Sequence, residues 1–476
     1  MGEVLLLLAV FVPIVGSFFL PLAGKLSSKF RNGLSLVFVL VSFAASVILL
    51  PSVLSGQSVL IKIELPLGLS FGFLADGLAV FMAMISSLVG AIIVFYSWGY
   101  MSHYKNLNEY YLMVVLFIGA MMGLVYSTNL IFLYVFWEIS AIACWRLIGF
   151  FREKEYVKRA NKAFMVTVFG ALMMLLGFFF IYQQTQTFDL TRMKGVQISD
   201  LAAAFILVGI FAKSATLPLH TWLADAGVAP SPVTSLLHAA VLVKIGVYAF
   251  ARFFLVNFTL DPVWNTVVPI IAAVSAIVSG GAALIDKDLK RIIAYSTVSQ
   301  LGFIFLGLST GSMMGIAGGL LYILMHSIAK GGLFLCAGIV EQNTHTKDIT
   351  KMGGLIKTMP VTGVAFILCA FSVMGIPPFG GFFAKFMVIN GAVNAGQVWI
   401  AVAFIVGAIL TIIYLLRVFA MVFLGTPKME GVKEGSRTML SSVTILAALS
   451  LIGGILINFP SAYVQGIVQQ MAVMFK

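Results

Sequence analysis

Six basic residues lie inside long apolar runs of this sequence, and they are the residues whose positions point first to chemistry. An ionisable side chain at the centre of a bilayer costs roughly 2.5–3.5 kcal/mol on insertion scales, so it is expected to face the bundle interior or a water path. Two of them, Arg146 and Arg417, lie close to helix ends and fit snorkelling to the interface equally well. The four lysines are deeper or lie beside helix breaks, which favours a functional role. They are Lys213, Lys244, Lys330 and Lys385.

A carboxylate and two histidines accompany these lysines. Glu138 lies in the middle of the run LIFLYVFWEISAIACW, where an isolated carboxylate needs a cation. His326 and Lys330 are four residues apart and therefore share one helix face. His238 and Lys244 are six residues apart, so they point to different neighbours. For both histidines we favour a proton relay over a hydrogen-bonded core residue.

Proton transfer is the chemistry that this set of residues suits. Burial favours the neutral form of a lysine, and a nearby carboxylate favours the charged form, so a change in their separation switches the lysine between holding and releasing a proton. No phosphate-binding loop, dinucleotide fingerprint or metal motif is found, and we expect no cofactor or metal in the chain. Asp76 lies near a helix start and is equally consistent with a capping role.

The composition excludes a soluble protein. Hydrophobic residues make up 61% of the sequence and charged residues 10%, whereas about a quarter of the residues of a soluble protein are charged. The net charge is +12, but the basic residues lie in short loops and form no single stripe, which argues against a nucleic-acid partner. The three cysteines lie far apart within apolar runs and indicate neither disulfides nor a metal site.

Fourteen apolar runs of spanning length predict an all-α polytopic membrane protein with about fourteen transmembrane helices. Two runs contain internal proline, at Pro218 and at Pro377 and Pro378. Because proline removes a backbone donor and clashes with the preceding turn, both helices should be broken. No linker or soluble domain is visible, so residues 1–476 are predicted to form a single membrane domain. The runs are 4–22, 34–54, 72–98, 110–126, 129–150, 162–182, 200–224, 233–256, 263–285, 291–308, 312–340, 362–394, 397–424 and 439–459.

The loop charges predict the orientation of the chain. Eighteen Lys and Arg residues fall on the face that holds the first loop and every second loop after it, against five on the face that holds both termini. The positive-inside rule therefore places the first face in the cytoplasm and both termini outside the cell. The cluster from Asp286 to Arg291 is interpreted as a solvated cytoplasmic turn, and the first apolar run as a retained membrane helix.

Several motifs, in this order, resemble the antiporter-like proton-pumping subunits shared by respiratory complex I, the Mrp cation/proton antiporters and the membrane-bound hydrogenases. The resemblance covers most of the chain from about Asp76 to about Lys385. The motifs are VFWEISAIACWRLIGF, ANKAFMVTVFGALMML, FAKSATLPLHTWLADAGVAPSPVTSLLHAAVLVKIGVY, DLKRIIAYSTVSQLGF, HSIAKGGLFLCAG, TKDITKMGGL and GIPPFGGFFAKF.

This resemblance implies fourteen helices with two inverted five-helix repeats, near 110–256 and 263–424. Helices 1–3 would lie near 4–98 and the last helix near 439–459, and helices 7 and 12 would be broken. It also implies roles for the residues above: Glu138 as the helix-5 glutamate, Lys213 as its helix-7 partner, Lys244 as the helix-8 relay, His326 and Lys330 as the central relay, and Lys385 as the helix-12 lysine beside the exit. His238 resembles a histidine of the branch nearest the largest complex I pump subunit.

The sequence departs from that branch after its last predicted helix, where neither a lateral helix nor a large extension follows. We therefore expect a non-redox membrane subunit that translocates H⁺, or exchanges Na⁺ for H⁺, in a multi-subunit complex I-like redox complex such as a membrane-bound hydrogenase. It would lie in the plasma membrane beside other membrane subunits and redox subunits with iron–sulfur clusters. The alternative is a subunit of an Mrp-type Na⁺/H⁺ antiporter without a redox partner. A solute carrier and a purely structural subunit are further alternatives, and the four buried lysines count against the second.

Overall fold

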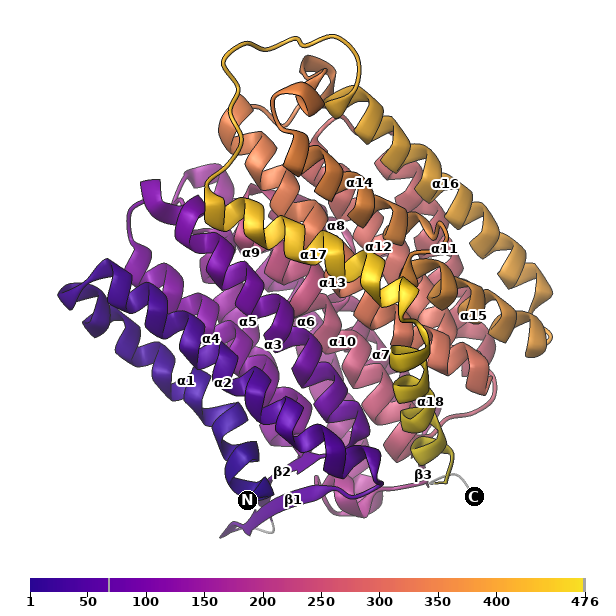
Figure 1. Cartoon of the computed structure of the whole chain (residues 1–476). Coiled ribbons are helices and arrows are strands. Elements are labelled where there is room, and N and C mark those ends of the chain that lie inside the picture. Colours follow the sequence, from indigo (N-terminus) through magenta and orange to yellow (C-terminus); the bar gives the residue numbers. More distant parts are fainter. Residues whose placement is uncertain (67–68, 474–476) are drawn as a thin grey trace.

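Long apolar helices make up almost the whole chain, because a segment in lipid must satisfy its backbone hydrogen bonds internally. The computed structural model describes residues 1–66 and 69–473. Within them, twelve helices are long and apolar enough to cross a membrane, and Pro360–Met374 is a shorter apolar helix. Figure 1 shows them packed side by side in one bundle. The helices are α1 Gly2–Leu26, α2 Ser28–Leu54, α3 Gly77–Tyr100, α4 Leu107–Tyr126, α5 Leu130–Ile148, α6 Lys154–Thr185, α7 Asp200–Lys213, α8 Thr221–Asp225, α9 Ser231–Ser235, α10 Leu242–Ala251, α11 Trp264–Ile285, α12 Leu289–Ser309, α13 Met313–Thr344, α14 Pro360–Met374, α15 Gly380–Asn394, α16 Val398–Phe423, α17 Arg437–Ile455 and α18 Asn458–Val473.

The predicted all-α polytopic class is confirmed, with short strands as the exceptions. β1 (Val59–Glu64) and β2 (Ser70–Ala75) form an antiparallel pair, and β3 (Val196–Gln197) pairs in parallel with β4 (Phe258–Thr259). The expectation of a helix from residue 72 is therefore wrong, because residues 70–75 pair with β1 and the helix begins only at Gly77. Asp76 caps that helix by accepting a hydrogen bond from the Ala79 amide at 2.9 Å, so its capping role is confirmed.

The C-terminal part also differs from the expectation of one last helix near 439–459. α17 ends at Ile455, and a further helix, α18, begins at Asn458. Gly453 and Gly454 weaken the helix just before this corner. α18 then packs against α13 and α3, which lets it cover the end of the bundle (Figure 1).

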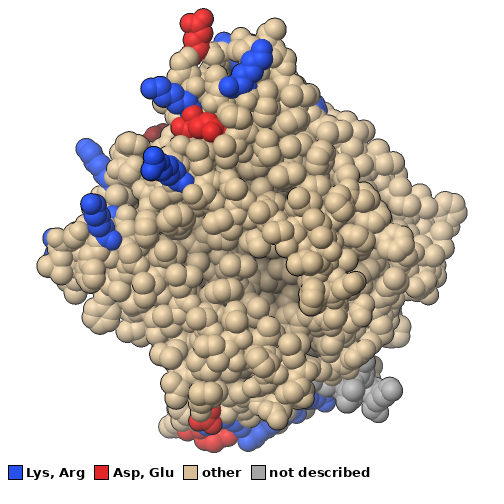
Figure 2. Space-filling view, viewed as in Figure 1, with Lys and Arg blue, Asp and Glu red and all other residues tan. Residues whose placement is uncertain are grey.

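The bundle has two polar ends. The hairpin face carries the start of α1, the β1–β2 hairpin and β3, at the bottom of Figure 1, and the loop face carries the segment that joins α16 to α17, at the top. Figure 2 shows Lys, Arg, Asp and Glu side chains at the upper left and at the bottom, while the wide middle of this side is free of them. Such a band is what a lipid-exposed surface requires.

Both proline-containing runs are interrupted in the structure. α7 ends at Lys213 and α8 begins at Thr221, with Pro218 between them, and α14 ends at Met374 and α15 begins at Gly380, with Pro377 and Pro378 between them. The next helix after α8 is also irregular. Residues Leu236–Ala240 (η5) and Arg252–Asn257 (η6) are π-helical on either side of α10.

Two turns at opposite ends of the bundle repeat the same sequence and the same hydrogen bonds. Each follows a 32-residue helix, α6 or α13, and each has the pattern T-x-T-x-D-[LI]-T. In both turns the aspartate accepts a hydrogen bond from the threonine amide two residues later, at 2.9 Å, and pairs with the residue before a helix, α5 or α12. The turns are Thr185–Thr191 and Thr344–Thr350.

Candidate functional site

Lys213 is the last residue of α7 and is completely buried. Its ammonium group donates a hydrogen bond to the Trp137 carbonyl of α5 at 3.1 Å and lies 5.1 Å from the centre of the Trp137 ring. Glu138 is the next residue along α5, and its Oε1 atom has no hydrogen-bond partner among the described residues. The structure therefore brings Lys213 to the backbone beside Glu138 and not into an ion pair with its carboxylate.

Lys244 and His326 are in direct contact at the centre of the bundle. Lys244 Nζ of α10 lies 2.8 Å from His326 Nδ1 of α13, and the two side chains are 0% and 1% exposed. Two positive charges at this separation would repel strongly in a medium of low dielectric constant. The pair is therefore stable with one proton between its two nitrogens, and His326 Nε2 is left without a partner in the described part of the chain.

Lys330 begins a connected series of hydroxyl and amide groups. Its ammonium donates to the Ser296 hydroxyl at 2.6 Å and to the Ile293 carbonyl at 3.2 Å. Tyr414 of α16 donates to the same Ser296 hydroxyl at 2.7 Å. Gln300 donates to the Tyr414 oxygen at 3.3 Å and accepts from Tyr322 at 2.6 Å. All of these groups are buried.

Lys385 lies at the far end of that series. Its ammonium is 4.5 Å from the centre of the Phe303 ring and 5.7 Å from the centre of the Tyr322 ring, a favourable arrangement for a cation. It also donates to the Val373 carbonyl at 2.7 Å, one residue before the end of α14. Lys385 is thus bonded to the helix break itself and is 4% exposed.

His238 lies in the π-helical segment η5 and is fully buried. Its ring packs on Phe334 of α13 with 4.3 Å between centroids, and neither ring nitrogen has a hydrogen-bond partner among the residues described. Buried polar groups are normally satisfied, so such a histidine is a place for water or for a transient proton. The structure does not join His238 directly to any of the buried lysines.

Comparison with known proteins places these residues in a family. Residues 127–411 match the family described as "NADH:quinone oxidoreductase/Mrp antiporter, TM", and residues 63–111 match "NADH-Ubiquinone oxidoreductase (complex I), chain 5 N-terminus". The first match covers more than half of the chain and includes Glu138, the four buried lysines, His238 and His326. The chain belongs to the NADH:quinone oxidoreductase/Mrp antiporter family. The predicted resemblance is confirmed.

Relatives within this antiporter family support the assignment. The chain is 31% identical over 503 residues to the Na(+)/H(+) antiporter subunit A1 of Staphylococcus aureus, with 98% of this chain covered. It spans 62% of the length of that relative. The fold is shared with a chain of the Mrp complex from Dietzia sp. DQ12-45-1b, with a TM-score of 0.90, 23% identity, and 98% and 99% of the two chains covered. A chain of the archaeal membrane-bound sulfane sulfur reductase has a TM-score of 0.88, 22% identity and 98% of each chain covered.

Several polar groups of this family member were missed from the sequence. Lys290 was expected in a solvated turn, but it is 2% exposed and forms an ion pair with Glu341 of α13 at 2.7 Å. Arg252, near the end of the predicted run 233–256, was not singled out in the sequence, but it is buried and paired with Asp76. These partners lie far apart in the sequence, so no local pattern reveals them. The polar series Ser296, Gln300, Tyr322 and Tyr414 was likewise missed, although AYSTVSQ is an unusually polar stretch for a buried helix.

The two arginines that fitted snorkelling have local partners. Arg146 forms an ion pair with Glu109 of α4, and Arg417 donates to the backbone carbonyls of Leu284 and Asp286. Both therefore bind groups near the loop face and are separate from the lysine series. Within residues 1–66 and 69–473, no cluster of three or more His, Cys, Asp or Glu side chains could hold a metal ion.

Proposed function

We propose that this chain is a proton-translocating membrane subunit in which buried lysines and histidines carry protons between the two faces of the membrane. The contact that supports this most strongly is the one between Lys244 and His326. One proton shared by two basic groups, with no carboxylate needed to hold it, is easily gained and lost. A permanent structural charge would instead be expected to carry an opposite charge beside it.

The route proposed for the proton follows the contacts. Lys213 and Glu138 lie on one side of Lys244 and His326, and Lys330 follows His326 by one turn of α13. The hydroxyl series from Ser296 to Tyr322 then leads to Lys385, which we infer to be the terminal carrier toward the outer face or an adjacent subunit. His238 and the two helix breaks provide polar groups and room for water beside this route.

The parent complex that we favour is a multi-subunit Mrp-type Na⁺/H⁺ antiporter. The sequence favoured a membrane-bound hydrogenase, but the relative from S. aureus supports the Mrp alternative, and the two solved folds suit both. Because the chain spans only 62% of that relative, its partners and its second ion are inferred here. We further infer fourteen spans, counting each broken helix as one, two inverted repeats, and a plasma-membrane orientation with the loop face in the cytoplasm.

The repeated threonine–aspartate turn supports the inverted repeats. The same turn follows α6 at the hairpin face and α13 at the loop face. The turn aspartate pairs with Asn129 in the first case and with Asp288 in the second, and the two paired residues are the same distance apart in the sequence in both cases. An inverted duplication places equivalent turns on opposite faces of the membrane. The flanking helices α5 and α12 would then be equivalent members of the two repeats.

The test is ion exchange by the complete complex in everted vesicles from a host without its own Na⁺/H⁺ antiporters. We expect Na⁺ addition to dissipate a pH gradient with the wild-type chain and not with Lys244→Met or His326→Leu, although both variants assemble. Lys62→Gln is the matched control, because it removes a partly exposed lysine of the hairpin. Wild-type exchange in an assembled Lys244→Met complex would contradict the proposal.

A further inference from the structure

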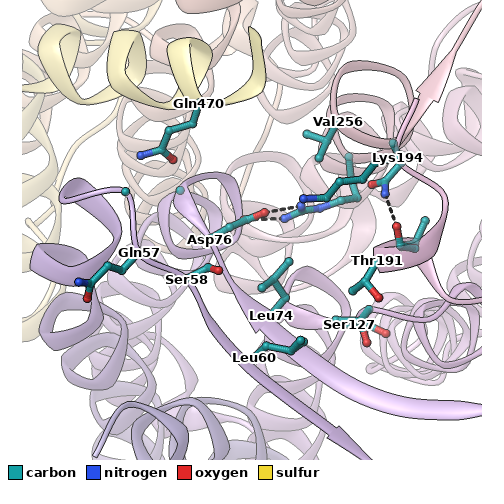
Figure 3. A pocket seen from close by; sticks show the side chains of 16 residues that line it. Gln57, Ser58, Leu60, Leu74, Asp76, Ser127, Thr191, Lys194, Val256 and Gln470 are labelled. Carbon is teal, nitrogen blue, oxygen red and sulfur yellow. Dashed lines mark hydrogen bonds and ion pairs between the residues drawn. The ribbon is translucent and has the colours of Figure 1, made fainter. Parts of the chain in front are cut away.

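A pocket of about 440 Å³ opens on the hairpin face, between the β1–β2 hairpin and the π-helical segment η6. Its lining includes Ser58, Asp76, Thr128, Arg252 and Asn257. In Figure 3, Asp76 points across the pocket, and dashed lines mark its contacts with Arg252. The route proposed above does not use this pocket.

The Asp76–Arg252 ion pair closes the deep end of the pocket. Arg252 Nη1 and Nη2 donate to the two carboxylate oxygens of Asp76 at 2.5 and 2.8 Å. The arginine side chain is 5% exposed and the aspartate side chain 18% exposed, so water in the pocket reaches mainly the carboxylate. A nearly buried ion pair often stabilises a fold no better than an apolar contact of the same shape. Stability alone therefore does not explain why an ion pair lies at this position.

Behind the ion pair, a polar face of one helix leads to the central lysine. Arg252 Nε donates to the Tyr248 hydroxyl at 2.8 Å, and Tyr248 donates to the Val125 carbonyl. Lys244, Tyr248 and Arg252 follow each other at intervals of four residues, so they lie on the same side of α10 and η6. Each interval is a rise of about 6 Å along an α-helix. The polar face therefore runs from the pocket to the pair formed by Lys244 and His326.

The pocket also contains buried acceptors without partners. Asn257 and Thr128 are 3% and 2% exposed, and Asn257 Oδ1 and Thr128 Oγ1 accept no hydrogen bond from any residue that the structure describes. Such groups are normally satisfied by ordered water, and the cavity has room for several molecules. The pocket is thus suited to hold water in contact with the Asp76 carboxylate.

We propose that this pocket is the mouth of a proton path between the Lys244–His326 pair and the hairpin face. The Asp76–Arg252 ion pair is the gate of this path. The proposal rests on the proton-translocating function above, with Lys385 exchanging protons with an adjacent subunit and this pocket serving as the opening to the hairpin face. In the outward step, the Tyr248 hydroxyl turns from the Val125 carbonyl toward Asp76 and gives its proton to that carboxylate, while Lys244 gives a proton to the Tyr248 oxygen. The neutral carboxyl group then releases Arg252 and passes the proton to water in the pocket, which restores the ion pair. One bond to hydrogen breaks for each that forms.

The first experiment covers the mouth without altering the gate. Ser58→Cys places a thiol at an exposed position of the lining, and Gln183→Cys places one at an exposed position of the same face outside it. The three native cysteines are buried, so the wild type is the unlabelled baseline. Both variants are treated, in the assembled complex, with a bulky membrane-impermeant maleimide dye on the hairpin side.

We expect labelled Ser58→Cys to lose at least nine-tenths of its ion exchange, while labelled Gln183→Cys keeps its rate. Unchanged exchange after complete labelling of Ser58→Cys, or no labelling of that variant, would contradict the proposal that the pocket is the mouth of the proton path. Loss of exchange in Lys244→Met together with unchanged exchange in labelled Ser58→Cys would leave the proposed function intact and reject only this inference. No exchange even in the untreated wild type would reject both.

The second experiment separates a gate from a clamp that only joins α3 to η6. Asp76→Asn keeps an oxygen that can accept from the Ala79 amide and from Arg252, but it cannot carry a proton. We expect the assembled Asp76→Asn complex to lose at least nine-tenths of its exchange, with Lys62→Gln as the control on the same face. A clamp predicts near wild-type exchange in every Asp76→Asn complex that assembles, and that result would overturn the gate.

Discussion

The two broken helices solve the same backbone problem with different side chains. In the first, the Ala212 carbonyl near the end of α7 accepts from the Trp222 indole at 3.0 Å, and the Leu217 amide in the break donates to Ser275 of α11 at 2.9 Å. In the second, the Val373 carbonyl near the end of α14 accepts from Lys385 at 2.7 Å. At the first break, neutral side chains form hydrogen bonds with the free backbone groups, whereas at the second break a lysine does so.

At the first break, the buried lysine does not hold the broken backbone in place, whereas at the second break it does. Lys213 bonds the Trp137 carbonyl of a neighbouring helix, and that carbonyl also accepts from Ser140 at 2.6 Å. Lys213 can therefore move or be replaced while its break keeps its own hydrogen bonds. Lys385 cannot leave without releasing a carbonyl of its own break, so a change in its protonation should alter the break as well.

The second break is also packed more tightly, and Gly381→Ala should have the largest effect. A Cβ atom on Gly381 would overlap the Ser372 carbonyl oxygen, and one on Gly454 of α17 would overlap Pro378 in the break. We expect Gly381→Ala to prevent assembly of the complex, because the Cβ atom would collide with the backbone of Ser372, which cannot move aside as a flexible side chain would. Gly227→Ala after the first break is the control, since its nearest neighbour would be Lys290 Cβ at an ordinary 3.7 Å. The yield of assembled complex is measured for both variants. Equal yields would contradict the conclusion that the second break is packed more tightly than the first.

Lys385→Arg tests whether the lysine at the second break carries a proton. Arginine keeps the positive charge and can still donate to the Val373 carbonyl, but it does not release a proton at accessible pH. We expect assembly to persist and ion exchange to fall by at least about 100-fold, the lower end of what a lost proton-transfer group costs. Wild-type exchange in assembled Lys385→Arg would show that the residue only tethers the break.

Replacing each lysine by methionine should sharpen the comparison through stability. Both variants remove a buried ammonium group, so that part of the change is shared. Lys385→Met also leaves the Val373 carbonyl without this donor, which costs about 1–3 kcal/mol for a buried group. In Lys213→Met the Trp137 carbonyl keeps its bond from Ser140. Thermal unfolding in detergent should therefore show a lower midpoint for Lys385→Met than for Lys213→Met, and the reverse order would contradict the assignment.

The two threonine–aspartate turns give the smallest expected effect, and it depends on pH. Burial raises the pKa of Asp189, but hydrogen bonds from Thr191 and Lys62 outweigh it, so the net pKa lies below the ordinary value. A lowered pKa stabilises the fold above the ordinary value of about 3.9, and this contribution is lost as the pH falls through the folded pKa. Asp189→Asn should thus lower the unfolding temperature at pH 7, and this difference should shrink as the pH falls below the ordinary pKa of an aspartate. Asp348→Asn is the comparison, because Asp348 occupies the same place in the other turn and is less buried than Asp189. We expect it to change less, and an equal or larger change would contradict this ranking.

Much of the architecture could be predicted because lipid imposes local rules. A run of about twenty apolar residues must be a helix, so each predicted run overlaps a helix of the structure, and prolines inside a run identify the places where a helix stops. The errors fall where that rule does not apply. Residues 70–75 belong to a hairpin at the polar end, which was predicted as helix, and α18 follows a corner just after Gly453 and Gly454, which hydrophobic length alone did not reveal.

The sequence by itself determined which residues are unusual: Glu138, the lysines and the histidines stand out because charge in an apolar run is costly. Only the tertiary structure decided what they touch. Lys244 meets His326 and Asp76 meets Arg252 across 82 and 176 residues of sequence. Lys213 meets a carbonyl in place of the carboxylate next to it. The reason is physical: the cost of burying a charge is a property of one residue in its own segment, whereas the partner that offsets this cost is chosen by how distant helices pack.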